Sequence, residues 1–560
     1  RLTEMENITI PSDEDILEDF RSHWTRFSEM SFEQLQDVQN TMRMLQLKAV
    51  QTIWNSTKDR LKAKLQQKCS QRIDTDVGKK VQMLYLVTAA TLMGLLQSGF
   101  LLVEVGTVPV RNIYVILSNA LINIIISGMI LFFVGYAWSR GEDAYGLWGT
   151  SYFMLTGILS EGDGLSESME DLTNQLGLYY FQYSFGVAVV AIMTTVTIGR
   201  TSHWTQIIQT TIMSGLVFPL LVHWGWENQG WMNSAVASYN IGLMDDGGSA
   251  LVHVCGGSAA LAAAFALGPR KYAEDVAFIP TSAPSWTYIG YMILMVGYTN
   301  FNAFEYYIHE SIFSSTEQSS NDSLKFVTNS VINTLVAAFG GGAAVIMIYM
   351  IFFKATFCTY FEFINIIISS LAGQISICGG CRRYSNAMAG IVGTIGGIMS
   401  FCWSYFVRAR IPVEDPVDAI AMHLIPGLWG IVAVCILDNS PRGILYSIMH
   451  KQGAKTCCLQ LLWNLFCTLI IFLFSFSVIY VLYRLLDLHR LLRSRIEEVE
   501  ILAHHQGCTD DELQEMVEAA QERDLFFNYL GPPGRFDKSN KNDKLHIPLG
   551  DHYQKKQFVE

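Results

Sequence analysis

The chain has 560 residues, of which 51% are hydrophobic and only 16% are charged, whereas roughly 25% of the residues in an average soluble protein are charged. The net charge is −12 at pH 7, and the acidic residues concentrate near the two ends of the chain, which we therefore expect to lie in water. This composition favours an integral membrane protein. The sequence has no basic run of the kind that binds nucleic acid, which excludes that class of partner.

The first 78 residues are polar, with apolar residues such as Phe20 and Trp24 at helical spacing. We predict that residues 1–78 form one or two amphipathic helices outside the bilayer. Sequons at Asn7 and Asn55 agree with an extracytoplasmic location and predict a glycoprotein. Three roles are open for this region: it assembles subunits, binds an unidentified partner or protects the outer face.

After residue 80 the sequence contains eleven apolar segments, and the longest of them exceed the ~20 residues that cross a ~30 Å hydrocarbon core. They lie at about 81–105, 113–137, 178–199, 205–224, 247–268, 284–305, 325–353, 356–376, 385–407, 416–437 and 459–484. We predict an all-α polytopic membrane protein with eleven transmembrane helices, comprising a membrane domain at residues 79–484 and a C-terminal tail at residues 485–560.

Most lysines and arginines of the loops fall on one side of these segments, together with the basic start of the C-terminal tail. The positive-inside rule then predicts that the C-terminus is cytoplasmic and the N-terminus is outside. The opposite side also carries basic residues, including Arg382 and Arg383.

Two of the apolar segments share a pattern in which an acidic residue precedes a histidine. Asp245 precedes His253, and Asp415 precedes His423. A single histidine on an apolar helix is usually a core residue, but one in each of two corresponding spans indicates an inverted repeat with a site between the halves. Two neutral imidazoles can share a hydrogen bond and line a polar track through an apolar channel. Such a track suits a small hydrogen-bonding solute.

These residues carry a family resemblance. Residues 245–253 resemble the Asp-x-Ala-Gly-Gly-x-x-x-His motif of ammonium transporters, and residues 415–418 followed by His423 resemble the family's second motif. Further similarities lie at residues 97–104, 181–185, 300–303 and 495–507. By this resemblance the chain is identified as a member of the Amt/Rhesus family of ammonium transporters, closer to the Amt branch.

The resemblance implies a homotrimer of the plasma membrane, with a separate pore in each subunit and no metal or cofactor. Trp224 would form an outer wall that attracts a cation to its aromatic face, an interaction of ~0.5–2 kcal/mol. Phe181 would lie beside this wall, and Phe185 and Phe301 would form the stacked gate below it. Asp245 would support the recruitment site by holding backbone groups.

The resemblance also implies that His253 and His423 are the twin histidines of the lumen and relay a proton. Ammonium can release a proton and cross as ammonia, whereas potassium would have to enter the apolar lumen as an ion at high cost. The predicted function is therefore ammonium transport, and the predicted partners are ammonium or ammonia and membrane lipid.

Three residues depart from the family pattern, namely Glu305, Phe304, which replaces a glycine, and Asp246. Glu305, next to Phe304, stands where the family has a serine, either as a helix end reaching water or as an extra carboxylate that strengthens or slows cation capture. Asp246 adds a second acid beside Asp245, and capping of a helix N-terminus accounts for it.

Three alternative functions remain open to different degrees. The chain could be an ammonium sensor or structural family member with little flux, and measured flux separates this from transport. A Rhesus-type channel for neutral ammonia or carbon dioxide is disfavoured by Asp245 and Trp224. An intramembrane metalloenzyme is disfavoured because neither histidine belongs to an HExxH motif, so we predict that the chain is not an enzyme.

The cysteines give a weak signal. Cys378 with Cys381, and Cys457 with Cys458, stand out among eleven cysteines. No second pair lies at metal-ligand spacing, so a local disulfide is favoured over a metal site.

Overall fold

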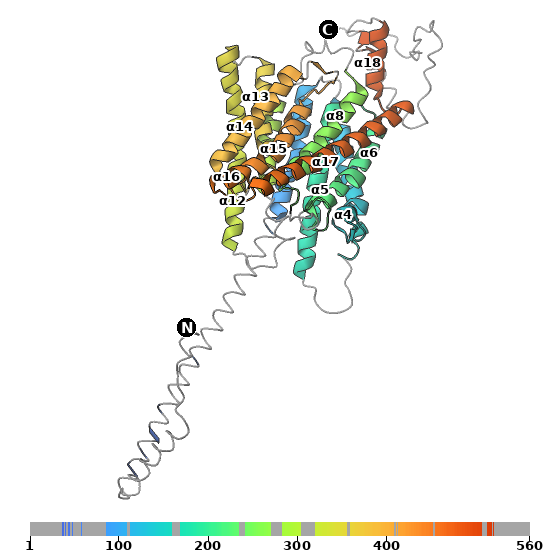
Figure 1. Ribbon diagram of the computed structural model, residues 1–560. Helices are drawn as coiled ribbons and strands as arrows, with labels where there is room; N and C mark the ends of the chain where they lie inside the picture. Colours follow the sequence, from blue (N-terminus) through green and yellow to red (C-terminus); the bar gives the residue numbers. More distant parts are fainter. Residues whose placement is uncertain are drawn as a thin grey trace, which may run out of the picture. The chain divides into compact units, whose positions relative to one another are not determined.

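The computed structural model describes residues 86–108, 113–158, 169–233, 241–269, 283–303, 320–354, 359–407, 410–411, 413–451 and 454–506, with isolated positions at 36–84 and 512–519. The chain divides into two units, Arg1–Gln82 and Met83–Glu560. In the first unit the described positions are helical and exposed. The second unit contains the helices that are labelled in Figure 1.

The described residues in the N-terminal half of the second unit are mainly helical and include a short hairpin, in which β1 Asp143–Ala144 pairs antiparallel with β2 Trp148–Gly149. Its first helix spans Leu86–Thr107. The others are α3 Ile113–Ile130, η2 Leu131–Gly135, α4 Tyr136–Arg140, η3 Phe153–Leu155, α5 Met169–Thr194, η4 Thr195–Thr197, α6 His203–Ile212, η5 Met213–Val217, α7 Phe218–Trp226, η6 Ser249–Val254 and α8 Cys255–Leu267.

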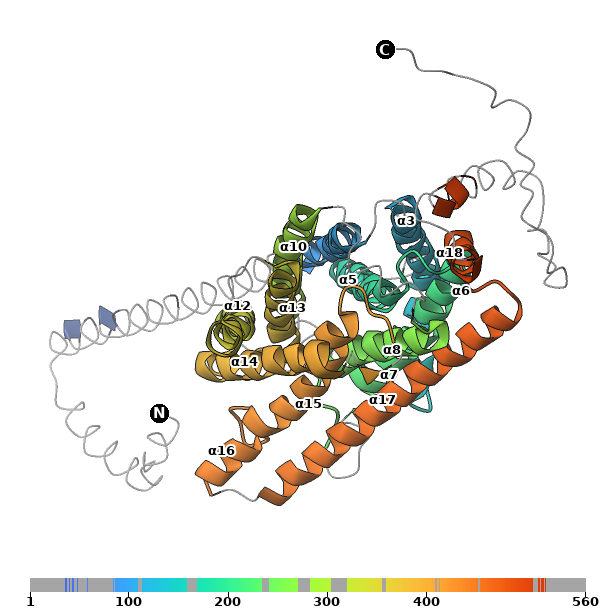
Figure 2. The same cartoon turned by 90° about the horizontal axis from the view of Figure 1, so that it is seen from above.

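The C-terminal half is helical as well. Its helices are α10 Pro284–Ala303, α12 Ser320–Ile348, η7 Tyr349–Phe353, α13 Tyr360–Ser376, α14 Asn386–Cys402, η8 Trp403–Val407, η10 Ile420–Leu424, α15 Ile425–Leu437, α16 Ile444–Met449, α17 Ala454–Leu488 and α18 Arg495–Gln506. Figures 1 and 2 show α17 as a long helix running past α8 and α15, with which it packs.

Within the described residues, nine helical stretches are long and apolar enough to cross a membrane. They are Leu86–Thr107, Ile113–Arg140, Leu176–Thr197, His203–Trp226, Ser249–Leu267, Lys325–Phe353, Asn386–Val407, Ile420–Leu437 and Lys455–Leu488. The two remaining predicted segments, 284–305 and 356–376, coincide with helices α10 and α13, which have 20 and 17 residues. The prediction of a mostly helical protein with many apolar spans is confirmed.

Small residues let the helices of the C-terminal half pack closely. A Cβ atom added to Gly393 of α14 would collide with the backbone of Ala337 in α12, and one added to Gly341 of α12 would collide with the Ser369 carbonyl of α13. Small side chains at such contacts are how helices approach one another in lipid, where burial of apolar surface gives little driving force.

The two histidine-bearing helices cross through a reciprocal pair of glycines. Gly257 and Gly427 each follow a histidine by four residues. A Cβ on Gly257 would come 2.8 Å from the Cβ of Leu424, while one on Gly427 would come 2.8 Å from the Ser249 carbonyl and 3.2 Å from the Cβ of His253. Each glycine therefore admits the backbone of the opposite helix beside a histidine, and the crossing is locally symmetric.

We expect Gly427→Val to separate these two helices. The added side chain has no room between Ser249 and His253, and overpacking of this kind costs typically ~1–3 kcal/mol. Thermal unfolding of the purified protein in detergent checks this, with Gly94→Val as the control because nothing lies within 4 Å of a Cβ at Gly94. Equal melting temperatures for the two variants would contradict the close crossing.

The chain after α17 returns to the helical bundle and is fixed there by ion pairs. Arg200, whose side chain is 1% exposed, binds Glu497 at 2.8 Å. Arg493 binds the same carboxylate at 2.9 Å, and the Ser494 amide donates to the Arg200 carbonyl at 2.7 Å. The start of the predicted tail, including α18, therefore belongs to the same packed unit as the spans.

Candidate functional site

A pair of buried histidines lies where the two locally symmetric helices cross. His253 is in the π-helical turn η6 and His423 is in the π-helical turn η10, a type of turn that occurs often at functional sites. Both side chains are 0% exposed. Their Nδ1 atoms are 3.1 Å apart and their rings are nearly parallel, at 13°. One Nδ1 must donate and the other accept, so the two neutral rings share one hydrogen bond.

An aspartate caps each of these two helices. Asp245 accepts hydrogen bonds from the backbone amides of Ser249 at 2.5 Å, Ala250 at 2.9 Å and Leu251 at 2.9 Å. Asp415 accepts from the amides of Ala419 at 2.8 Å and Ile420 at 2.7 Å. Because the first amides of a helix have no partner within it, both carboxylates satisfy groups that would otherwise be orphaned. Each cap fixes the start of a turn that carries a histidine.

Three phenylalanine rings form a row that ends at the histidine pair. The ring centroids of Phe185 and Phe301 are 4.3 Å apart, and those of Phe181 and Phe185 are 4.4 Å apart. Phe301 in turn lies 5.4 Å from His253. All three phenylalanines are at most 2% exposed, so they form a buried apolar row beside His253.

The tryptophan that contacts these rings is Trp226, two residues beyond the one selected from the sequence. The Trp226 ring meets Phe185 edge-on, with centroids 5.4 Å apart, and its Nε1 donates to the Asp245 carbonyl at 2.8 Å. Trp224 instead lies against Phe474, at 5.2 Å. The structure therefore places Trp226 rather than Trp224 against the phenylalanine rings, because residues two apart on a helix point about 200° apart.

The other side of the histidine pair is lined by residues that sequence reasoning missed. Phe100 lies 5.8 Å from His423, and Tyr298 lies 5.8 Å from His253 and 6.2 Å from His423. Tyr298 precedes Phe301 by three residues on α10, so helical periodicity was a usable signal. The Nε2 atom of His423 is buried and, within the described part of the chain, has no hydrogen-bond partner.

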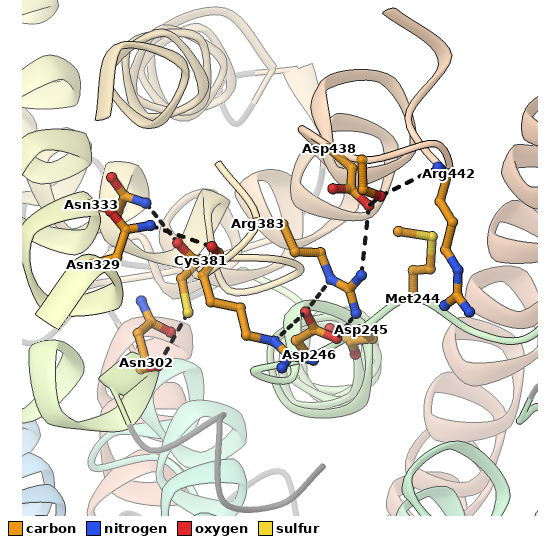
Figure 3. Close-up of polar contacts among 12 residues, drawn as sticks. Met244, Asp245, Asp246, Asn302, Asn329, Asn333, Cys381, Arg383, Asp438 and Arg442 are labelled. Carbon is orange, nitrogen blue, oxygen red and sulfur yellow. Dashed lines mark hydrogen bonds and ion pairs between the residues drawn. The ribbon is translucent and has the colours of Figure 1, made fainter. Parts of the chain in front are cut away.

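An ion-pair network lies beside Asp245 (Figure 3). Asp246 receives a hydrogen bond from Arg383 at 2.7 Å and pairs with Arg382 at 3.3 Å, and Arg383 also reaches Asp438 at 3.6 Å. The side chain of Asp246 thus forms ion pairs with two arginines, a role that the sequence did not indicate. Burial raises the pKa of Asp438, whereas Arg383 lowers it.

Burial also raises the pKa of Asp245, to about 7, although its three backbone amides act in the opposite direction and the charge of Asp246 adds to the increase. The carboxyl is therefore held in an environment where both protonation states are accessible near neutral pH.

None of the four cysteines singled out from the sequence is joined in a disulfide. The thiol of Cys381 donates to the Asn302 carbonyl at 3.1 Å, and Cys378 lies beside His253. Cys457 is buried and Cys458 is exposed, without a bond between them. Neither pair therefore forms the local disulfide that the sequence left open. Among the residues that the structure describes, no three His, Cys, Asp or Glu side chains are grouped so as to hold a metal ion. Glu305 and Phe304 lie outside the described residues.

Known proteins are similar to this chain in sequence. The chain is 28% identical over 450 residues to putative ammonium transporter 1 of Caenorhabditis elegans, covering 77% of this chain and 78% of the relative. It is 26% identical over 439 residues to a putative ammonium transporter of Synechocystis, with 76% and 88% covered.

Solved structures share the fold. A protein titled "Sensor Amt Protein" superposes with a TM-score of 0.63 at 24% identity, covering 76% of this chain and 97% of the other. Candida albicans Mep2 superposes with a TM-score of 0.61 at 19% identity, covering 75% and 88%. The family model described as the Ammonium Transporter Family matches residues 83–509, and the chain therefore belongs to that family of membrane transporters.

Proposed function

We propose that the chain moves ammonium across a membrane through a pore centred on His253 and His423, with the proton and the ammonia carried separately. The observation that carries this proposal is the Nδ1–Nδ1 hydrogen bond of 3.1 Å between two fully buried histidines. Buried ionisable groups at membrane depth are costly and are usually functional. A pair that shares one proton offers both a donor and an acceptor to a passing solute.

Recruitment of the cation takes place before the phenylalanine rings. Trp226 supplies an aromatic face beside Phe185, and Asp245 holds the backbone of the adjacent turn through three amides. A cation is attracted to the face of an indole ring. Asp245 supports the site at Trp226 without touching the cation, since backbone amides occupy its carboxylate oxygens. Glu305 is a further carboxylate that captures the cation.

We expect Trp226→Ala to raise the ammonium concentration at half-maximal current by about 2- to 30-fold, the range that corresponds to a cation–π interaction of ~0.5–2 kcal/mol. Trp226→Phe retains part of the effect because a smaller aromatic face remains. Current in proteoliposomes over a range of ammonium concentrations measures both. Trp224→Ala is the matched control, since Trp224 lies two residues away and packs on Phe474; an equal shift for Trp224→Ala counts against the assignment.

Selectivity follows from the loss of water at the phenylalanine pair. Phe185 and Phe301 provide no polar group to replace the hydration shell of an ion, so a permanent cation such as potassium pays the full desolvation penalty. Ammonium avoids this penalty by transferring a proton to the imidazole pair and passing as neutral ammonia. The two histidines thus serve as the proton relay.

The architecture completes the proposal. The nine apolar stretches together with α10 and α13 make eleven spans arranged as an inverted repeat, with the N-terminus outside and the C-terminus in the cytoplasm. The protein is a glycosylated homotrimer of the plasma membrane, and each subunit has its own pore. Residues 1–78 form an extracytoplasmic helical region that contacts a partner or a neighbouring subunit.

The second candidate function is an ammonium sensor with little flux. It is favoured by the similarity to a solved structure titled "Sensor Amt Protein" and by Glu305, which departs from the family pattern. The test is electrogenic current in proteoliposomes after an ammonium jump, compared with a potassium jump. Current for ammonium alone supports transport, whereas tight ammonium binding without current supports the sensor.

A further inference from the structure

A third hydrogen-bonding group extends the histidine pair. The Sγ atom of Cys378 lies 3.5 Å from His253 Nε2 and 3.5 Å from the Gln374 carbonyl oxygen. Cys378 follows the end of α13 and is 0% exposed. Sulfur hydrogen bonds are longer than those of oxygen, and a thiol is both a weak donor and a weak acceptor. Cys378, His253 and His423 therefore form one continuous chain.

The proton positions in this chain are coupled. In one arrangement the thiol donates to the Gln374 carbonyl, His253 Nε2–H donates to sulfur, and His423 Nδ1–H donates to His253 Nδ1. The Nε2 atom of His423 is then an acceptor. In the other arrangement the thiol donates to His253 Nε2, His253 Nδ1–H donates to His423 Nδ1, and His423 Nε2 carries a proton. Both arrangements contain the same three protons, because the hydrogen bond at one imidazole nitrogen sets the state of the other.

We propose that Cys378 is a positioning residue that sets which nitrogen of each histidine carries its proton, and thereby whether His423 Nε2 meets the solute as an acceptor or a donor. This inference rests on the proposed function. The Gln374 carbonyl favours the first arrangement, because it gives the thiol proton a second acceptor. In that arrangement His423 Nε2, which has no partner among the described residues, is ready to accept a proton from ammonium.

The chain offers a closely matched control. Cys381 lies three residues after Cys378 and is also 0% exposed, but its thiol donates to the Asn302 carbonyl at 3.1 Å. Replacement of either cysteine removes one buried thiol from the same turn. Only the replacement of Cys378 alters the histidine chain.

The transport test compares four variants of the full-length protein in proteoliposomes. We expect Cys378→Ala to lower the ammonium current by about three- to tenfold, the range expected for loss of one buried hydrogen bond. Cys378→Ser retains the current within about twofold because a hydroxyl also donates and accepts, and Cys381→Ala and Cys381→Ser retain it as well. Equal currents for Cys378→Ala and Cys381→Ala would overturn the inference.

A spectroscopic test measures the hydrogen bond without transport. The S–H stretching band of Cys378 is the infrared difference between the wild-type protein and Cys378→Ala. The same difference is then measured between His253→Ala and the double variant His253→Ala, Cys378→Ala. A changed frequency in the His253→Ala background supports the inference, and an unchanged frequency overturns it. The proposed function itself fails if the double histidine variant keeps a full ammonium-selective current, whatever the S–H band does, so the two failures are distinguishable.

Discussion

Replacing both His253 and His423 by alanine is expected to lower the ammonium current by about 100-fold or more, the scale on which a positioned acid–base group contributes to a proton transfer. The two rings share a hydrogen bond of 3.1 Å inside a site that is closed to solvent. Without them the described residues around this site no longer offer an imidazole that can take the proton from ammonium. The measurement is electrogenic current in proteoliposomes after an ammonium jump, with a potassium jump beside it.

The single variants sharpen this prediction. If the pair acts as one unit, His253→Ala and His423→Ala each lower the current nearly as much as the double substitution, because effects within one catalytic unit are not additive. His450→Ala is the control, since His450 is exposed and stacks only on Tyr446. Current that persists for ammonium but not potassium in the double variant would contradict the relay, while potassium current would show that the histidines also exclude ions.

The spans and the histidine pair are predictable from the sequence for a physical reason. Hydropathy over ~20 residues is a property of a contiguous segment, and the acid-then-histidine pattern is contained within nine residues in each span. Local patterns of this kind predict the fold because each helix in lipid must form all of its backbone hydrogen bonds within itself. The reciprocal crossing at Gly257 and Gly427 was not predicted, because it is a contact between two segments far apart in the sequence.

The remaining features depend on contacts between distant segments. Trp224 and Trp226 are equally aromatic in the sequence, and only the orientation of α7 against Phe185 selects Trp226. Asp246 stands at a helix start, yet its carboxylate binds Arg382 and Arg383 from more than 130 residues away. The partner of such a side chain is fixed by tertiary packing, which a single sequence does not encode locally.

Asp245→Ala is expected to have the second large effect, on both stability and transport. Three backbone amides, those of residues 249–251, lose their acceptor, and each buried amide left unsatisfied costs roughly 1–3 kcal/mol. The π-helical turn that carries His253 then loses its fixed start, so we expect a lower melting temperature together with the loss of ammonium current. Asp246→Asn is the neighbouring control. If Asp246→Asn lowers the melting temperature and the current as much as Asp245→Ala does, the effect comes from the loss of negative charge in this region and not from the loss of the hydrogen bonds that Asp245 accepts.

Asp245→Asn separates the cap from the charge and gives a dependence on pH. Burial raises the pKa of Asp245 from 3.8 to about 7, so between these values the folded protein binds more protons than the unfolded chain. Stability from this group is therefore fully present below about pH 4 and is lost as the pH rises through about 7. The melting temperature of the wild-type protein should accordingly fall between pH 5 and pH 8 by more than that of Asp245→Asn, which cannot titrate. If the melting temperatures of the two proteins change in parallel with pH, the three backbone amides keep Asp245 ionised from pH 5 to pH 8. Its only contribution to the site is then the hydrogen bonds that it accepts from these amides.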